Sequence, residues 1–231
     1  MQKVKNNWNY VVGKLAIVLI SGALLTAPAS ADSPGRGITA QFEKDYLTFI
    51  INHHFSALRM TELAAGTDLQ REAAIDNPQE GTSPTPDTSA TPAKATSDEI
   101  KSMARQANRM QREEIATAQR FLREWYGINS TPQLLPEGQQ QIQLLEQTAA
   151  GEQFNHVFLE VFSSHHYRAL APSQDCRVKA DLKHDSLIHY CEGIVENQTR
   201  GINEMRKQLC DKFNICDFQP TTGVRGQSSM E

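Results

Sequence analysis

Apolar side chains recur every three or four positions along four stretches of this chain, a spacing that places them on one face of an α-helix. The stretches run from Phe42 to Ala64, from Met103 to Trp125, from Phe154 to Ala169 and from Leu187 to Leu209. Polar residues fill the positions between. The pattern therefore predicts four long amphipathic helices, none of which can bury its apolar face alone.

Short local signals mark the ends of these helices. Ser97 is typical of a helix N-cap, and the two acids after it suit the positive end of a helix dipole. Gly127 is the predicted stop of the same helix. Pro172 is predicted to end the third helix early, because proline lacks the N–H that continues a helix. The linker at 128–150 is predicted to contain one short helix at 139–149.

The two halves of the chain repeat one pattern. The motif Gln-Phe-x-x-x-aromatic-Leu, followed by His-His-x-x-Ala-Leu, begins at Gln41 and recurs at Gln153, an offset of 112. The helix that follows repeats at an offset of 87, which pairs Gln111 with Gln198. The difference predicts an insert in the first copy, and the Pro/Thr/Ser-rich stretch at about 76–97 has the composition of a disordered segment.

This repeat predicts an all-α fold, a four-helix bundle built from two repeated helical hairpins. The first hairpin repeat is assigned to 32–127 and the second to 151–218, followed by a flexible tail at 219–231.

The first 31 residues have the composition of a signal peptide. Three lysines precede an apolar run, which ends at Ala29-Ser30-Ala31, the small-x-small pattern that signal peptidase reads. The apolar run is shorter than the ~20 residues that a membrane-spanning helix needs, which argues against the alternative of an uncleaved anchor. We therefore expect a periplasmic or secreted protein with no membrane span in the mature chain.

Composition and charge narrow the class of partner. Of 231 residues, 39% are hydrophobic and 22% charged, as in a globular protein. Loss of the three signal-peptide lysines takes the formal net charge from −4 to −7. Because so acidic a body repels nucleic acid and attracts cations, we expect no nucleic-acid partner.

All four cysteines, Cys176, Cys191, Cys210 and Cys216, lie in the last quarter of the chain. An exported protein can keep disulfides. Of the three pairings that four cysteines permit, we favour Cys176–Cys191 and Cys210–Cys216. The alternative, a thiolate metal site, lacks C-x-x-C spacing and is exposed to oxidation.

Two pairs of adjacent histidines, His53-His54 and His165-His166, occupy equivalent places on the apolar faces of the first and third helices. Neighbours on a helix point about 100° apart, so each imidazole is expected to pair with a residue across the bundle. Imidazole combined with thioether favours copper, above all Cu(I) over Cu(II). The candidate thioether ligands are Met60, Met103, Met110 and Met205.

These residues also have structural interpretations. A buried histidine is commonly a neutral core residue hydrogen-bonded to a carbonyl or an amide, and a methionine at helical spacing commonly fills the core. Gln111 and Gln198 can orient a histidine or close a hydrogen bond between helices. His184 and His189 form a weaker candidate for an accessory surface site, with solvated histidines as the alternative.

The aromatic-Leu motif, the paired histidines and the glutamine helix that follows resemble the bacterial domain-of-unknown-function 305 family, over about 41–126 and 151–209 as a tandem pair. The resemblance implies a ferritin-like helical bundle, export, and copper binding or tolerance. The second copy departs from the family pattern, since Gly201 stands where the first copy has Glu114. The residues that the resemblance marks for a metal site are His53, His54, Met60, His165 and His166, with Gln111, Glu114 and Gln198 on the partner helices.

Two hypotheses follow. In the first, the protein binds copper and sequesters it or delivers it to a copper exporter or acceptor protein, using His53, His54 and Met60 first and the second histidine pair after them. Since imidazoles must be neutral to ligate, binding is expected to weaken as the pH falls through the usual histidine range. In the second, the protein is a metal-free interaction module whose histidine pairs only pack.

An enzyme is the least supported class. The chain has neither the Glu-x-x-His of di-iron proteins nor His-Glu-x-x-His, a phosphate loop or a dinucleotide fingerprint.

Overall fold

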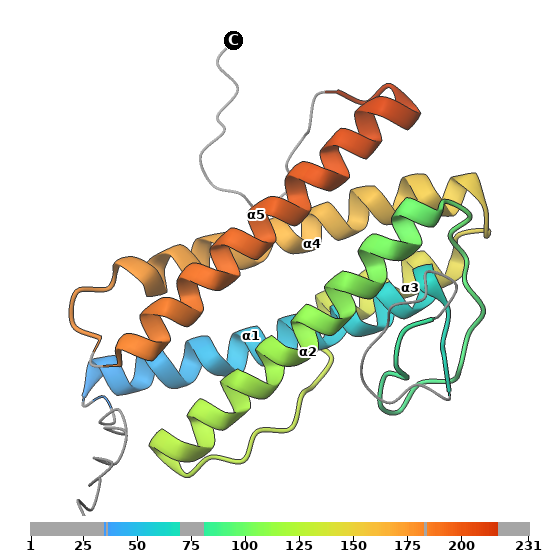
Figure 1. Ribbon diagram of the computed structural model, residues 1–231. Coiled ribbons are helices and arrows are strands. Elements are labelled where there is room, and N and C mark those ends of the chain that lie inside the picture. The colour runs from blue at the N-terminus through green and yellow to red at the C-terminus, as the bar shows by residue number, and fades with distance from the viewer. Residues whose placement is uncertain (1–34, 36, 70–80, 183, 217–231) are drawn as a thin grey trace, which may run out of the picture. The chain divides into compact units, whose positions relative to one another are not determined.

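The structure, a computed structural model, describes residues 35, 37–69, 81–182 and 184–216, which belong to one compact unit, Asp32–Glu231. The predicted signal peptide and tail, and part of the predicted insert, lie outside the described residues. Within them the protein is all-helical, with five helices and no strand (Figure 1). None of these helices combines the length and apolar character needed to cross a lipid bilayer.

The four long helices are those that the apolar pattern predicts. They are α1 (Ile38–Ala65), α2 (Asp98–Tyr126), α4 (Glu152–Val178) and α5 (Asp185–Phe213). The short linker helix α3, Pro136–Gln147, begins earlier than expected, because Pro136 takes the first position of a helix, where no N–H is needed.

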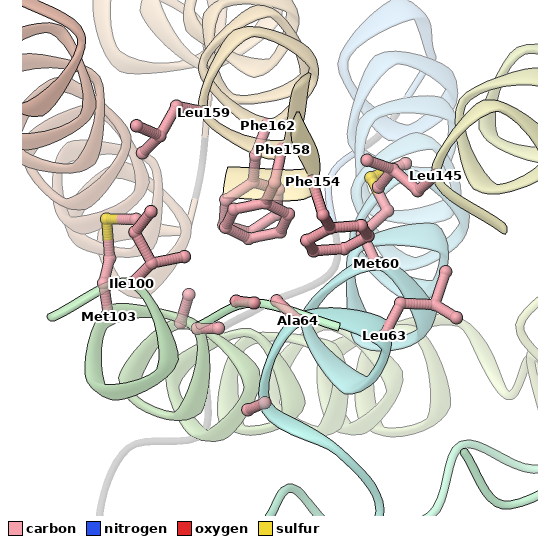
Figure 2. Packing of buried hydrophobic residues seen from close by; sticks show 14 of the residues in the cluster. Met60, Leu63, Ala64, Ile100, Met103, Leu145, Phe154, Phe158, Leu159 and Phe162 are labelled. Atoms are coloured by element: carbon pink, nitrogen blue, oxygen red, sulfur yellow. The ribbon is translucent and has the colours of Figure 1, made fainter. Parts of the chain in front are cut away.

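Helices α1 and α2 pack along each other, as do α4 and α5, so the chain forms two hairpins (Figure 1). Helix α1 also contacts α4 and α3. Three fully buried phenylalanines of α4, Phe154, Phe158 and Phe162, lie at the centre of one hydrophobic cluster (Figure 2). Burying each such side chain contributes roughly 1.5–3 kcal/mol, so this cluster is a main source of stability.

The two predicted end signals of α2 are confirmed. The Ser97 hydroxyl accepts a hydrogen bond from the backbone N–H of Ile100 at 3.4 Å. Gly127 closes the helix in the left-handed conformation, with φ of 67°, which glycine adopts without steric cost.

The prediction that Pro172 ends the third helix is wrong, since α4 continues through it to Val178. Proline removes one backbone hydrogen bond, at a cost of ~3 kcal/mol. Side chains beyond the proline offset this cost. Ser173 shares a 3.0 Å hydrogen bond with the hydroxyl of Tyr46 on α1, and Cys176 is joined covalently to α5.

The segment 81–97 differs from the disordered insert that its composition predicts. The backbone N–H groups of Lys94 and Ala95 donate to the carbonyls of Leu63 and Ala64 at the end of α1, and Thr82 exchanges backbone hydrogen bonds with the turn after α1. The buried carboxylate of Glu62 accepts hydrogen bonds from the threonines of this segment. Polar anchors on the helix therefore order a segment that has little apolar surface.

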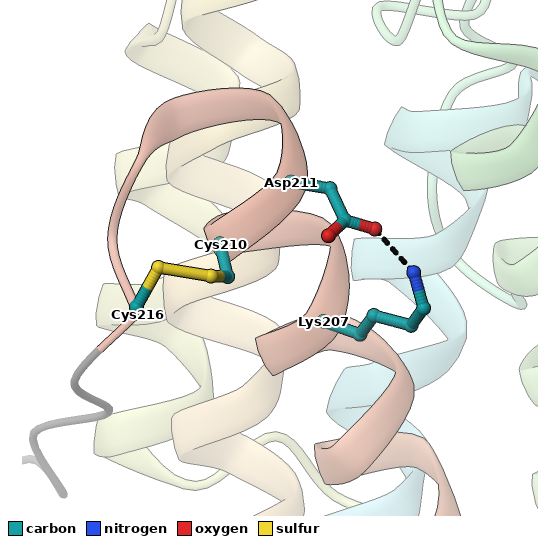
Figure 3. The surroundings of a disulfide bond; sticks show 4 residues. All are labelled: Lys207, Cys210, Asp211 and Cys216. Carbon is teal, nitrogen blue, oxygen red and sulfur yellow. Dashed lines mark hydrogen bonds and ion pairs between the residues drawn. A yellow bond between two sulfur atoms is a disulfide. The ribbon is translucent and has the colours of Figure 1, made fainter.

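Both favoured disulfides are confirmed. Cys176 at the end of α4 is bonded to Cys191 on α5, and both are buried. Cys210 near the end of α5 is bonded to Cys216, beside the Lys207–Asp211 ion pair (Figure 3). The first bridge joins the two helices of the second hairpin at the turn between them.

Candidate functional site

The two histidine pairs come together where α1 packs against α4. The rings of His53 and His165 stack with 3.8 Å between their centroids and 2° between their planes. Nε2 of His53 lies 3.1 Å from the backbone oxygen of His165, and because a carbonyl can only accept, Nε2 carries the proton. Nδ1 of His165 lies 3.1 Å from Oε1 of Gln141 on α3. Each of these imidazoles thus pairs across helices, as the sequence predicts.

His54 is fully buried and faces α2. Its Nε2 lies 2.8 Å from Oε2 of Glu114, an ion-pair distance, although the two groups are not aligned for a hydrogen bond. The other carboxylate oxygen of Glu114 accepts a 2.9 Å hydrogen bond from the amide of Asn197, and its backbone oxygen accepts one from the Tyr190 hydroxyl. Glu114 therefore closes the space beside His54 and links α1, α2 and α5.

His166 has a different environment. Its Nδ1 donates to the backbone oxygen of Phe162 at 3.0 Å, which leaves the lone pair of the neutral ring on Nε2. Gly201 lies against this edge of the ring, where an added Cβ would be 2.8 Å from Cδ2 and 3.0 Å from Nε2 of His166. The missing side chain at Gly201 therefore makes room for the edge of the His166 ring, at the position equivalent to Glu114 beside His54.

A small pocket with a cavity volume of about 40 Å³ opens beside His166, between α2 and α5. Its lining includes Met103 and Met110 from α2 and Met205 from α5. A space of ~10–15 Å³ already holds one water molecule, so this pocket has room for an ion. The lining thus contains one imidazole and three thioethers, the soft donor types that suit Cu(I), together with the charged side chains of Arg200 and Glu204.

Burial sets the protonation of these histidines. Loss of solvation, followed by the nearby His54, lowers the pKa of His166 to about 3. Burial is also the main reason why the pKa values of His53 and His165 lie well below the usual range. His166 is therefore neutral, and able to ligate, at pH values far below those at which an exposed histidine takes up a proton.

Other predicted ligands do not reach the small pocket beside His166, which we call the Met103 pocket. Met60 is fully buried in the phenylalanine cluster, on the other side of the rings from Met103 (Figure 2). His53, His54 and His165 do not line the pocket. Within the described part of the chain, no three His, Cys, Asp or Glu side chains gather as a metal site, so a site here depends on methionine sulfur.

Gln111 and Gln198 are fully buried on α2 and α5. Within the described residues, neither the nitrogen nor the oxygen of either amide has a hydrogen-bond partner. The prediction that one of them orients a histidine is therefore not met by a direct contact. The alternative prediction, a hydrogen bond between helices closed by these amides, is not met either.

The accessory surface site predicted at His184 and His189 does not form. His184 is fully buried, with Nδ1 2.6 Å from Oε2 of Glu43 and its ring stacked on Trp125 at 4.0 Å between centroids. His189 is exposed on the outside of α5, beside Glu192. The buried acid on α1, which the sequence analysis did not single out, draws His184 inward.

The importance of Gly201 could not be recognised from the sequence. Its alignment with Glu114 was visible, and it suggested that the second copy had lost a site residue. Only the packing of α5 on α4 shows that the His166 ring lies against Gly201, at the edge of a pocket. The pocket thus lies beside one histidine of the second pair, His166, whereas the sequence favoured the first pair.

A family model described as "Domain of unknown function (DUF305)" matches residues 88–209, which is more than half of the chain. The match begins before α2 and ends in α5, so it includes all residues of the Met103 pocket and leaves α1, with His53 and His54, outside. No curated protein and no solved structure matches the chain.

Proposed function

The chain belongs to the DUF305 family, and from this premise and the pocket beside His166 we propose that it is an exported protein that binds Cu(I), sequestering it or handing it to a copper exporter or an acceptor protein. One observation carries the proposal. The unprotonated nitrogen of His166 and the side chains of Met103, Met110 and Met205 line the same small pocket. Magnesium and calcium prefer oxygen ligands, whereas this donor set matches a soft monovalent ion.

Two features of the pocket prepare His166 to bind the ion. The hydrogen bond from Nδ1 to Phe162 fixes the tautomer of His166 and holds Nε2 toward the space beside Gly201. Burial keeps the ring neutral, so binding needs no proton release over the usual histidine range. This revises the expectation from sequence that binding weakens as the pH falls through that range.

Two further proposals complete this account. The four long helices form a ferritin-like bundle of two duplicated hairpins, supported by the offsets of 112 and 87 and by the pairing of α1 with α2 and of α4 with α5. Export is supported by the two disulfides, which persist in oxidising compartments.

Replacing Gly201 with alanine is expected to weaken Cu(I) binding at least tenfold. The new Cβ would meet the His166 ring at 2.8 Å, so the ring must move or the pocket must close. The measurement is an anaerobic titration against a chromophoric Cu(I) chelator. The matched control is Gly193→Ala on the same helix, where a Cβ meets nothing within 4 Å. Alanine favours a helix over glycine at both positions, so both variants are expected to fold.

An affinity of Gly201→Ala equal to that of the parent would count against the pocket. The alternative function is a metal-free interaction module whose histidine pairs only pack, as the stacked rings of His53 and His165 do. It predicts that Cu(I) leaves the melting temperature unchanged, whereas a tightly bound ion stabilises the folded state by mass action.

A further inference from the structure

The three methionines of the Met103 pocket differ in their exposure to solvent. Met205 is fully buried and Met103 is 6% exposed, and both belong to the phenylalanine cluster, as does the fully buried Met60. Met110 is only partly buried and lies outside that cluster. Among the methionines that the structure describes, Met110 is therefore the one with the largest exposed fraction.

A wider pocket, with a volume of about 250 Å³, adjoins the Met103 pocket between α2 and α5. Met110 and Asn197 line both pockets, so they lie at the boundary between them. Met103 and Met205 line only the smaller one. Since a water molecule takes up about 30 Å³ in the liquid, the wider pocket has room for a small polar oxidant such as hydrogen peroxide beside Met110.

Oxidation changes the value of a thioether as a ligand. Hydrogen peroxide transfers one oxygen atom to the sulfur: the S–O bond forms, the O–O bond breaks, the sulfur is oxidised by two electrons and the peroxide leaves as water. The product, methionine sulfoxide, is polar and offers a harder oxygen atom in place of the soft sulfur lone pair. Because Cu(I) prefers soft ligands, the pocket then has one suitable ligand fewer.

The position of Met110 also determines what oxidation does to the fold. A sulfoxide disrupts a hydrophobic core because a polar group is buried there, which would apply to Met103 and Met205. At the partly exposed Met110 the sulfoxide oxygen can instead be hydrated. Oxidation at this position is therefore expected to change ion binding and to leave the fold in place.

On the premise of the proposed Cu(I) site, we propose that Met110 is its peroxide-sensitive ligand. Oxidation of Met110 to the sulfoxide lowers the affinity of the pocket, and the remaining donors, His166, Met103 and Met205, then release the ion more readily. The change is reversible, since methionine sulfoxide reductases return the sulfoxide to the thioether. Peroxide in the surroundings of the protein thus controls how much Cu(I) it retains.

The test treats the metal-free protein with hydrogen peroxide and follows each methionine by peptide mass spectrometry. Met110 is expected to oxidise at least tenfold faster than Met60, Met103 and Met205, with the helical circular dichroism signal retained. After removal of the peroxide, titration against a chromophoric Cu(I) chelator should show at least tenfold weaker binding. Treatment with methionine sulfoxide reductase should restore the original affinity.

Met110→Leu is the matched variant, because leucine has about the volume of methionine and no sulfur to oxidise. It is expected to bind Cu(I) more weakly than the parent from the start, and peroxide should not weaken its binding further. Oxidation of Met103 or Met205 as fast as Met110, or an oxidised parent that binds as tightly as the untreated one, would overturn the proposal. Absence of Cu(I) binding by the untreated parent is a separate result, which would overturn the Cu(I) site and this proposal with it.

Discussion

The metal-free protein is expected to lose more than about 2 kcal/mol of its free energy of unfolding between pH 7.5 and pH 4.5, because the buried imidazoles of His53, His165 and His166 do not take up protons that the unfolded chain accepts. Burial and the neighbouring His54 lower the pKa of His166 to about 3, and burial and His53 place the pKa of His165 well below the usual range. In the unfolded chain all three histidines titrate near pH 6.5. Their contribution is fully present above pH 6.5 and is lost as the pH falls from there toward the folded pKa values.

The measurement is urea unfolding followed by circular dichroism at one-unit pH intervals. Replacing His165 by glutamine should reduce the slope of stability against pH by about 1.4 kcal/mol per unit below pH 6, the value for one proton. The exposed His189 is the control position, and its alanine variant should keep the slope of the parent. A stability that does not change between pH 7 and pH 5 would show that these imidazoles are protonated in the folded state.

Replacing Glu62 by alanine is expected to cost about 3–5 kcal/mol, the range for removing one partner from a buried ion pair. Glu62 is fully buried, and its carboxylate pairs with Arg59 at 3.4 Å. The same carboxylate accepts hydrogen bonds from the backbone of Thr85 and the hydroxyl of Thr88. Its loss would leave the Arg59 charge without its buried partner and release the segment 81–97 from α1.

Hydrogen exchange distinguishes the release of segment 81–97 from the overall loss of stability. Amides at 82–95 should lose more protection than the lower free energy of unfolding alone explains. The control is Glu146→Ala, which removes the other carboxylate that Arg59 contacts. That side chain is 46% exposed, so its loss should cost below about 1 kcal/mol. Equal costs for the two variants, with protection retained at 82–95, would contradict the anchoring role of Glu62.

Local patterns in the sequence predicted most of the fold. The apolar spacing located the four long helices, and Ser97 and Gly127 bounded α2 because caps depend on neighbouring residues alone. The favoured disulfide pairing, which the sequence alone could not establish, joins cysteines that are 15 and 6 residues apart.

The failures share a physical cause, which is dependence on residues distant in sequence. The order of the segment 81–97 depends on Glu62 inside α1, and the continuation of α4 through Pro172 depends on Tyr46 and Cys191. Composition and propensity describe only the segment itself, so neither effect is visible in them.

In the candidate site, too, local patterns were predictable from the sequence and contacts between distant residues were not. The sequence singled out His166 and the three methionines as candidates, but their grouping depends on how α2, α4 and α5 face one another. Met60 shares a face with His53 on α1 and yet lies in the phenylalanine cluster, while Met103 and Met205 meet from different helices. Gly201 contributes by having no side chain, which a search for ligand residues does not register.

The most direct test of the central claim is X-ray absorption of the protein loaded with one equivalent of Cu(I), with its disulfides intact. The account predicts a mixed shell of one nitrogen, from His166, and two or three sulfurs, from Met103, Met110 and Met205. Replacing Met103 by leucine should remove one sulfur and keep the nitrogen. A shell of nitrogen alone, as expected if the histidines gathered the ion without the methionines, would contradict the claim.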